Sequence, residues 1–185
     1  MLLLALMFAL STVSIGAFAQ DWPMFRADLE HTGTTVASAP ILGVLNWEYT
    51  TGGVVHSSPA VVGGMVYIGS NDGKVYCLDA ATGAMNWEYQ TGSLAYSSPA
   101  VVGGMVYIGS NDNNVYCLDA ETGAKNWEYD TGSYVGSSPA VVGGMVYIGS
   151  YNHKVYSLDA DTGAKNWEYT TGGIVYSSPA VVGGM

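Results

Sequence analysis

The sequence repeats itself every forty residues. Four tryptophans share this interval, each between an asparagine and Glu-Tyr: Trp47, Trp87, Trp127 and Trp167. The fourteen residues SSPAVVGGMVYIGS occur in full three times, at 57–70, 97–110 and 137–150. A period near forty is typical of a four-stranded propeller blade or of a two-helix solenoid repeat.

The composition of the unit favours strands over helices. The unit is rich in Val, Tyr, Gly and Ser, and it contains no apolar run with helical spacing. We expect its four strands at SPAVV, MVYIGS, KVYCLD and AMNWEY, with turns at Gly63-Gly64, Asn71-Asp72-Gly73 and 80–83 between them. Gly-Gly and Asp-Gly readily supply the positive φ angles of tight hairpin turns, so neighbouring strands should be antiparallel. Later copies place Asp112-Asn113 and Asn152-His153 in the second turn, and these residue types tolerate a left-handed backbone.

Burial patterns then indicate the arrangement of the strands. MVYIG is apolar on both faces, whereas NWEY alternates between aromatic and polar residues, which suits an inner strand and an outer strand of a radial blade. The sequence therefore predicts an all-β protein, an incomplete β-propeller of four-stranded antiparallel blades. Its complete blades should cover 57–90, 97–130 and 137–170, with a partial blade at 177–185 and an outer strand of the closing blade at 45–49.

An incomplete ring has consequences at its two ends. Propellers usually have four to eight blades, so the end blades should present open strand edges and self-associate. We expect the gene to continue with further units whose last strands pair with 45–49. In the present chain, Trp47 should then be less buried than Trp87 or Trp127.

The N-terminal region has the composition of an export signal. An apolar run from Leu2 to Leu10 is followed by the small-residue segment Ala17-Phe18-Ala19, although a basic region before the run is missing. We expect a signal peptide at 1–19, cleaved or retained as an anchor, and a lead-in segment at 20–44. The protein should then be extracytoplasmic, that is secreted, periplasmic or at the cell surface, and should contact a membrane only through an uncleaved N-terminus.

The net charge argues against a nucleic-acid partner, and the spacing of the cysteines argues against a disulfide. A formal net charge of −10 repels phosphate backbones, so we expect no nucleic-acid partner. Cys77 and Cys117 occupy the same position in successive repeats, which does not suit the converging geometry of a disulfide. We interpret both as core-filling thiols.

Three segments resemble the repeat of the pyrroloquinoline-quinone-type (PQQ-like) propeller family: LDAATGAMNW, LDAETGAKNW and LDADTGAKNW. The segment DWPMFRADLEHTGTT at 21–35 is similar to the lead-in of that family. The aspartate can cap its own turn, the glycine can adopt a left-handed conformation, and the tryptophan ring can lie against a neighbouring blade. The resemblance implies that nine residues dock blade on blade without binding the quinone: Asp79, Gly83, Trp87, Asp119, Gly123, Trp127, Asp159, Gly163 and Trp167.

Members of the family differ in function. Some resemble quinoprotein dehydrogenases with PQQ and calcium on the propeller axis, and others are non-catalytic, such as the scaffold lipoprotein of outer-membrane β-barrel assembly. The chain has no adjacent cysteine pair, no Cys-x-x-Cys-His haem motif and no distinct cluster of metal-binding residues, so we expect a non-catalytic protein-binding or scaffold module without a cofactor. Two alternatives remain: an N-terminal fragment of a PQQ-dependent dehydrogenase, with PQQ and calcium in the full-length protein, and a cell-surface structural repeat protein.

The copies differ mainly in two segments. These are the loop after WEY and the turn between the second and third strands, which antiparallel connectivity places on the same face of a propeller. That face should carry a possible binding surface made of His56, Tyr96, Tyr134, Tyr151, His153 and Tyr176. Asp72, Asp112, Lys74 and Lys154 should lie on the same face. The alternative is sequence drift at exposed positions, and no nucleophile–base arrangement can be argued from these residues.

Overall fold

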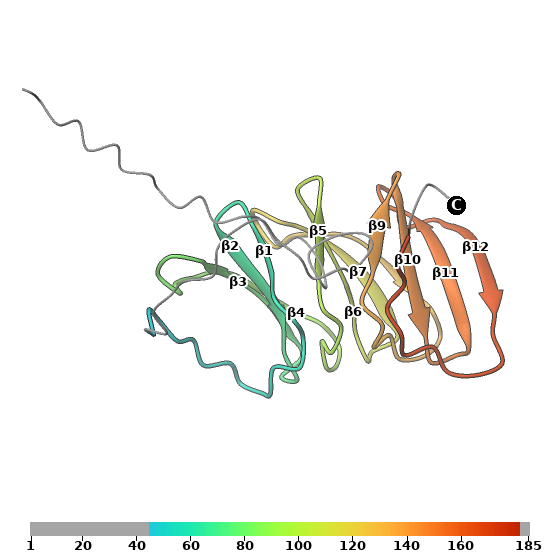
Figure 1. Cartoon of the computed structure of the whole chain (residues 1–185), viewed down its shortest axis with the longest axis horizontal. Helices are drawn as coiled ribbons and strands as arrows, with labels where there is room; N and C mark the ends of the chain where they lie inside the picture. The colour runs from blue at the N-terminus through green and yellow to red at the C-terminus, as the bar shows by residue number, and fades with distance from the viewer. Residues whose placement is uncertain (1–44, 182–185) are drawn as a thin grey trace, which may run out of the picture.

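A computed structural model describes residues 45–181 as three four-stranded antiparallel sheets, arranged side by side in chain order (Figure 1). The first sheet contains β1 (Ala60–Val62), β2 (Met65–Gly69), β3 (Lys74–Asp79) and β4 (Met85–Gln90). The second contains β5 (Ala100–Val102), β6 (Met105–Gly109), β7 (Asn114–Asp119) and β8 (Lys125–Asp130). The third contains β9 (Ala140–Val142), β10 (Met145–Ser150), β11 (Lys154–Asp159) and β12 (Lys165–Thr170). Within each sheet every strand pairs with its neighbour in sequence, which confirms the propeller blade predicted from the repeat.

The turns have the predicted backbone geometry. Gly63 and Gly64 both have positive φ angles, 58° and 76°, between β1 and β2. At the second turn the left-handed residue is Gly73 in the first blade, Asn113 in the second and His153 in the third. Few residue types adopt this conformation without strain, which explains why only Gly, Asn and His stand there.

Burial follows the expected radial order. Ile108 in β6 is fully buried, because sheets cover it on both sides. In β4 the side chain of Trp87 is buried, whereas Asn86 and Glu88 on the opposite face are exposed. A register shift between Cys77 and Leu78 lets the outer strand bend where it follows its turn.

Hydrogen bonds between serines join the inner ends of the blades. The amide of Ser58 donates to Ser98 Oγ at 2.8 Å, and the amide of Ser98 donates to Ser138 Oγ at 3.0 Å. A third bond of 3.0 Å joins the amide of Ser138 to Ser178 Oγ. Each SSP segment is therefore fixed by the copy that follows it along the chain.

The core lies between the sheets. Val101 and Ile108 of the second sheet pack in one cluster with Cys77 and Trp87 of the first. Cys117 belongs to the next cluster, and both cysteines are free and buried in different blades. Among residues 45–181 no helix is long and apolar enough to span a membrane.

The two ends of the described chain are the segments predicted to belong to incomplete blades. Residues 45–49 and 177–181 form no strand, because the partner strands that would complete their hydrogen-bond ladders are not part of residues 45–181. Trp47 is only partly buried, whereas Trp87 and Trp127 are each 8% exposed, as expected for an outer strand without its own sheet. The signal segment 1–19 and the lead-in 20–44 lie outside the described residues.

Candidate binding face

The repeated aspartate stabilises the turn before each outer strand. Asp79 Oδ1 accepts hydrogen bonds from the amides of Ala81 and Thr82 at 3.0 and 2.8 Å, and from the Thr82 hydroxyl at 2.8 Å. Hydrogen bonds from the hydroxyl and the amide of Thr82 lower the pKa of Asp79. Asp119 and Asp159 have the same arrangement, so these three carboxylates are engaged within their own turns.

The tryptophan of one blade contacts the turn of the next. Trp87 Nε1 donates to the carbonyl of Ala120 at 3.0 Å, and its ring covers Gly123, which has a φ of +73°. Trp127 contacts the carbonyl of Ala160 and covers Gly163 in the same way. Trp47 does so with Ala80 and Gly83, although residues 45–49 belong to no sheet. Trp167 is 44% exposed and makes no such contact within the described residues.

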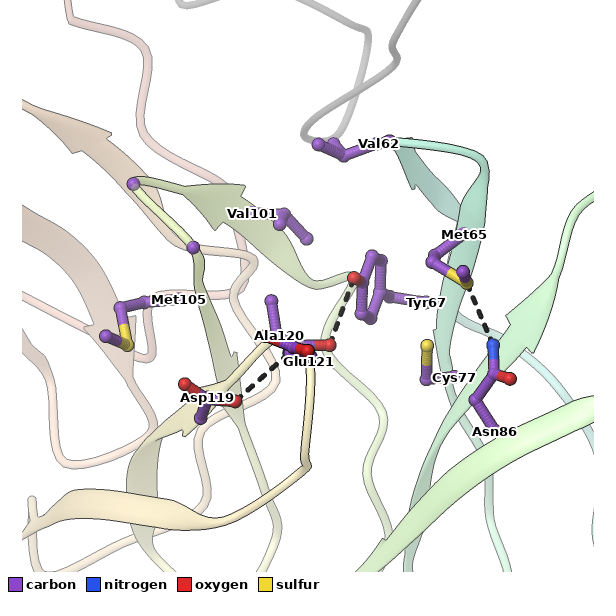
Figure 2. A pocket seen from close by; sticks show the side chains of 13 residues that line it. Val62, Met65, Tyr67, Cys77, Asn86, Val101, Met105, Asp119, Ala120 and Glu121 are labelled. Atoms are coloured by element: carbon purple, nitrogen blue, oxygen red, sulfur yellow. Dashed lines mark hydrogen bonds between the residues drawn. The ribbon is translucent and has the colours of Figure 1, made fainter.

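A groove of about 740 Å³ lies next to the first of these junctions (Figure 2). Met65, Tyr67 and Cys77 line it from the first sheet, while Met105 and Ala120 line it from the second. Two of its polar side chains are paired within the groove: Asn86 Nδ2 donates to Met65 Sδ at 2.8 Å, and Tyr67 OH donates to the carbonyl of Ala120 at 3.2 Å. The carboxylates of Asp119 and Glu121 also line it. The groove therefore offers mainly apolar contact.

The same groove recurs at the next junction. There a smaller space of about 430 Å³ is lined by Met105, Cys117, Asn126, Ala160 and Asp161. A feature that recurs with the repeat follows from blade packing and is no specialised site. A specialised site is therefore expected on the face where the copies differ.

Backbone hydrogen bonds bring the two variable segments together on that face. The amide of Asn71, in the turn after β2, donates to the carbonyl of Val54 at 2.9 Å. Equivalent bonds of 2.9 Å join Asn111 to Leu94 and Tyr151 to Tyr134. Each loop after an outer strand is thus held against a turn of the following blade, and we call these segments the loop face.

Five aromatic side chains make ring contacts on the loop face, in one pair and one group of three. The rings of His56 and Tyr96 stack with centroids 4.9 Å apart, and those of Tyr151 and Tyr176 meet edge to face at 4.6 Å. The ring centroids of Tyr134 and Tyr151 are 5.9 Å apart. We call His56, Tyr96, Tyr134, Tyr151 and Tyr176 the aromatic row. His153, the sixth predicted residue, is exposed in its turn and makes no ring contact with the row.

An exchange of residues keeps an aromatic ring in the row at the third blade. The position of His56 and Tyr96 is Gly136 in the next copy, and a Cβ added there would stand 3.2 Å from Tyr151 OH. Tyr151 itself occupies the position of Asn71 and Asn111. The turn therefore supplies the ring that the loop lacks, and the glycine leaves the space for it.

The row is open to solvent on its outer side. Tyr96, Tyr134 and Tyr176 are 42%, 50% and 63% exposed. Burial, together with the nearby phenols of Tyr176 and Tyr96, raises the pKa of Tyr151, so this ring stays neutral and forms the inner part of the row. The surface therefore presents aromatic rings and hydroxyl groups that are already held in place.

The charged residues predicted on this face have other roles. Asp72 Oδ2 accepts hydrogen bonds from Tyr76 OH and the amide of Gly52, each at 2.7 Å. Burial alone would raise the pKa of Asp72, but bonds from Tyr76, Lys74 and Gly52 lower it. Asp112 makes the equivalent contacts with Tyr116 and Gly92. Lys74 and Lys154 pair with glutamates of their outer strands, Glu88 and Glu168.

Sequence reasoning missed three polar atoms of the loop face. The Oδ1 atoms of Asn71, Asn111 and Asn152 are buried and have no hydrogen-bond partner among the described residues. The repetition of Asn71 and Asn111 is visible in the sequence, but only the fold shows that their oxygens are buried. An ordered water could satisfy them, since buried polar groups without a protein partner are commonly hydrated.

The carboxylates and imidazoles of the described residues do not converge on a common point. Among residues 45–181 there is no group of three or more His, Cys, Asp or Glu side chains placed to hold a metal ion. The carboxylates of Asp72 and Asp112 already accept hydrogen bonds from a tyrosine of their own blade and from a glycine of the preceding loop. The described residues therefore do not fit a site for PQQ with calcium, and no catalytic step is derived through that group.

The sequence matches one protein family. The family described as outer membrane protein assembly factor BamB matches residues 26–173 and 131–185. No curated protein sequence matches the chain significantly.

Solved structures have similar folds. The BamB of Moraxella catarrhalis is 28% identical with a TM-score of 0.62, over 70% of this chain and 41% of that one. The quinohemoprotein alcohol dehydrogenase of Comamonas testosteroni is 24% identical with a TM-score of 0.70, over 80% of this chain and 27% of that one. A europium-containing methanol dehydrogenase is 21% identical with a TM-score of 0.69, over 80% of this chain and 31% of that one. The chain thus spans less than half the length of these structures, and the two dehydrogenases show a similarity of fold alone.

Proposed function

We propose that this chain, which belongs to the family of the outer membrane protein assembly factor BamB, is an exported, non-catalytic propeller module that binds a protein partner. The observation that carries the proposal is the aromatic row, a pair and a group of three contacting rings on the face where the repeats differ. The apolar segment at 2–10 supports an extracytoplasmic location.

The chemistry of the row suits a protein interface. Tyrosine provides large contact area at low conformational cost, and it is enriched where proteins meet. Tyr96 and Tyr176 are held by ring contacts before any partner arrives, so little further ordering is needed on binding. The exchange of Gly136 and Tyr151 keeps an aromatic ring at the third blade, which favours a maintained aromatic surface over drift at exposed positions.

Charge favours one kind of partner surface. The formal net charge is −10, and Lys74 and Lys154 are paired with glutamates of their own sheets. A partner with a positive surface would be attracted over a distance and could place cationic groups on the tyrosine rings.

The test compares two variants in capture from an extract of the cell envelope. Tyr96→Ser with Tyr176→Ser removes exposed rings of the row, and Glu121→Ala with Asp161→Ala changes the opposite face as the matched control. We expect the unmodified chain and the control to retain the same protein, and the tyrosine variant to lose it. Equal capture by both variants, or no specific capture at all, would overturn the proposal.

A second measurement distinguishes the dehydrogenase alternative. Calorimetric titration with PQQ and calcium should give no binding to the chain, and quinone-dependent dye reduction should stay at background. Micromolar binding of the quinone would favour the enzyme fragment over the binding module.

A further inference from the structure

The outward face of β12 differs from the equivalent faces of β4 and β8. Trp167 is 44% exposed, compared with 8% for Trp87 and Trp127. Tyr169 is 67% exposed, whereas the equivalent Tyr89 packs 5.7 Å from Tyr116 of the following blade. Within the part of the chain that the structure describes, no blade covers this face, which lies at one end of the row of sheets (Figure 1).

The same face also carries hydrogen-bond donors without their usual acceptor. Tyr67 and Tyr107 donate to the carbonyls of Ala120 and Ala160 in the following blade, each at 3.2 Å. Among residues 45–181 the equivalent Tyr147 OH donates only to the sulfur of Met145, at 3.3 Å. Trp167 Nε1 likewise has no acceptor among residues 45–181.

The complementary surface is present at the other end of the molecule. The first blade has the turn at 80–83, and a short segment that belongs to no sheet covers it. Trp47 Nε1 donates to the carbonyl of Ala80 at 2.9 Å, and the ring of Tyr49 lies 5.7 Å from that of Tyr76. Residues 45–50 thus occupy the position that the outer strand of a preceding blade would take.

The segment that covers the first blade is identical in sequence to the outer strand of the third. Both 46–53 and 166–173 read NWEYTTGG, whereas the two intervening copies read NWEYQTGS and NWEYDTGS. Every side-chain contact of 46–49 with the first blade can therefore be made by the same residue of 166–169.

We propose that the face of β12 docks head to tail onto the first blade of a second copy of this chain, in place of that copy's residues 45–50. The contact repeats the interface that already joins the first sheet to the second and the second to the third. Trp167 then covers Gly83 of the receiving copy, and Tyr169 packs on Tyr76.

Equivalent contacts replace most of those that the exchange breaks. In the docking copy, residues 51–60 of the receiving copy displace residues 171–180. Ser58 of the receiving copy then takes the place of Ser178 as acceptor for the amide of Ser138. Tyr147 OH gains the carbonyl of Ala80, which accepts only from Trp47 within the described residues. The first blade of the receiving copy also covers one face of β9, β10 and β11 in the docking copy.

Head-to-tail contacts of this kind are heterologous, so they close into a ring or extend into a chain of copies. Two copies together supply six sheets, from three in each, which is within the four to eight blades of closed propellers. The docking surface is lateral, but the exchange also reaches the loop face, where His56 of the receiving copy takes the place of Tyr176 beside Tyr151 of the docking copy.

The experiment is sedimentation equilibrium of the purified chain over a range of concentrations. We expect a reversible, discrete species of two or more copies. Trp167→Ala should weaken association at least about tenfold, because a central buried tryptophan commonly dominates an interface. Trp47→Ala should strengthen association several-fold, because it weakens the competing segment of the receiving copy.

The opposite responses of two equivalent tryptophans separate this proposal from others. Pairing through the backbone edge of β12 would be indifferent to Trp167→Ala, and non-specific aggregation would be neither discrete nor reversible. A chain that stays monomeric at all concentrations, or a Trp47→Ala variant that associates less than the unmodified chain, would overturn the proposal. Far-UV circular dichroism of both variants verifies that the exposed substitutions leave the fold intact.

Discussion

The indole of Trp87 lies so close to Gly123 of the following blade that an added Cβ would stand 2.7 Å from Trp87 Cδ2. The same approach joins Trp127 to Gly163. A tryptophan and a glycine thirty-six residues later therefore form the unit by which one blade fixes the next.

This contact predicts a large cost for a side chain at Gly123. Gly123→Ala should lower the free energy of unfolding by about 2–4 kcal/mol, since it adds a clash with the indole to the strain of a positive φ. Gly132→Ala is the matched control, because its φ is +81° and nothing lies within 4 Å of an added Cβ. It should cost only about 1 kcal/mol in urea unfolding. Equal costs for both substitutions would mean that the indole does not restrict Gly123.

The serine hydrogen bonds predict a smaller effect at the inner strands. Ser98→Ala removes the acceptor of the Ser58 amide and should cost about 1 kcal/mol of unfolding free energy. Ser93→Ala in the neighbouring loop is the control, since its hydroxyl has no partner among the described residues. If the two variants unfold at the same denaturant concentration, the bonds between SSP segments contribute nothing measurable.

The turn aspartates predict acid sensitivity. Hydrogen bonds from the following threonine, hydroxyl and amide, lower the pKa values of Asp79, Asp119 and Asp159. A lowered folded-state pKa contributes stability that is complete above the ordinary aspartate pKa of about 3.9 and is lost as pH falls through the folded value. The urea concentration at the unfolding midpoint should therefore decrease as the pH is lowered from about 5 to about 2. Asp119→Asn should reduce this pH dependence, and an unchanged profile would contradict the assignment.

The buried thiols predict slow labelling. Burial raises the pKa of Cys117 to about 11 and also raises that of Cys77, so at pH about 8 neither is a thiolate in the folded chain. A thiol reagent should label both cysteines at once in denaturant, but only as fast as the blades open under native conditions. Rapid labelling of the native chain would place the cysteines at an accessible surface.

The sequence predicted the blades well because each strand and turn depends on local residues. The Gly-Gly pairs at 63–64, 103–104 and 143–144 all have positive φ angles and form hairpin turns, and the sequence NWEY alternates between polar and aromatic residues in every copy. The strand expected at 45–49 does not form, because a strand needs a neighbour for its ladder and residues 45–181 offer it none. Its aromatic side chains nevertheless pack on the first blade. Trp47 and Tyr49 make the same contacts as the tryptophans and tyrosines of true outer strands.

The candidate site was predictable only in part. Antiparallel connectivity predicted that the variable residues lie on one face, and five of the six predicted residues make ring contacts there, in a pair and a group of three. The exchange between Gly136 and Tyr151 was not predictable, because it depends on the distance between two loops that share no periodic relationship. The buried oxygens of Asn71 and Asn111 were missed for the same reason.

Site-specific photo-crosslinking tests the central claim, binding at the aromatic row, most directly. A photoreactive phenylalanine derivative is placed at Tyr96 on the loop face and, as the matched control, at Glu121 on the opposite face, and each protein is irradiated in an envelope extract. We predict one crosslinked partner from position 96 and none from position 121. Crosslinks to the same protein from both positions, or from position 121 alone, would contradict the account.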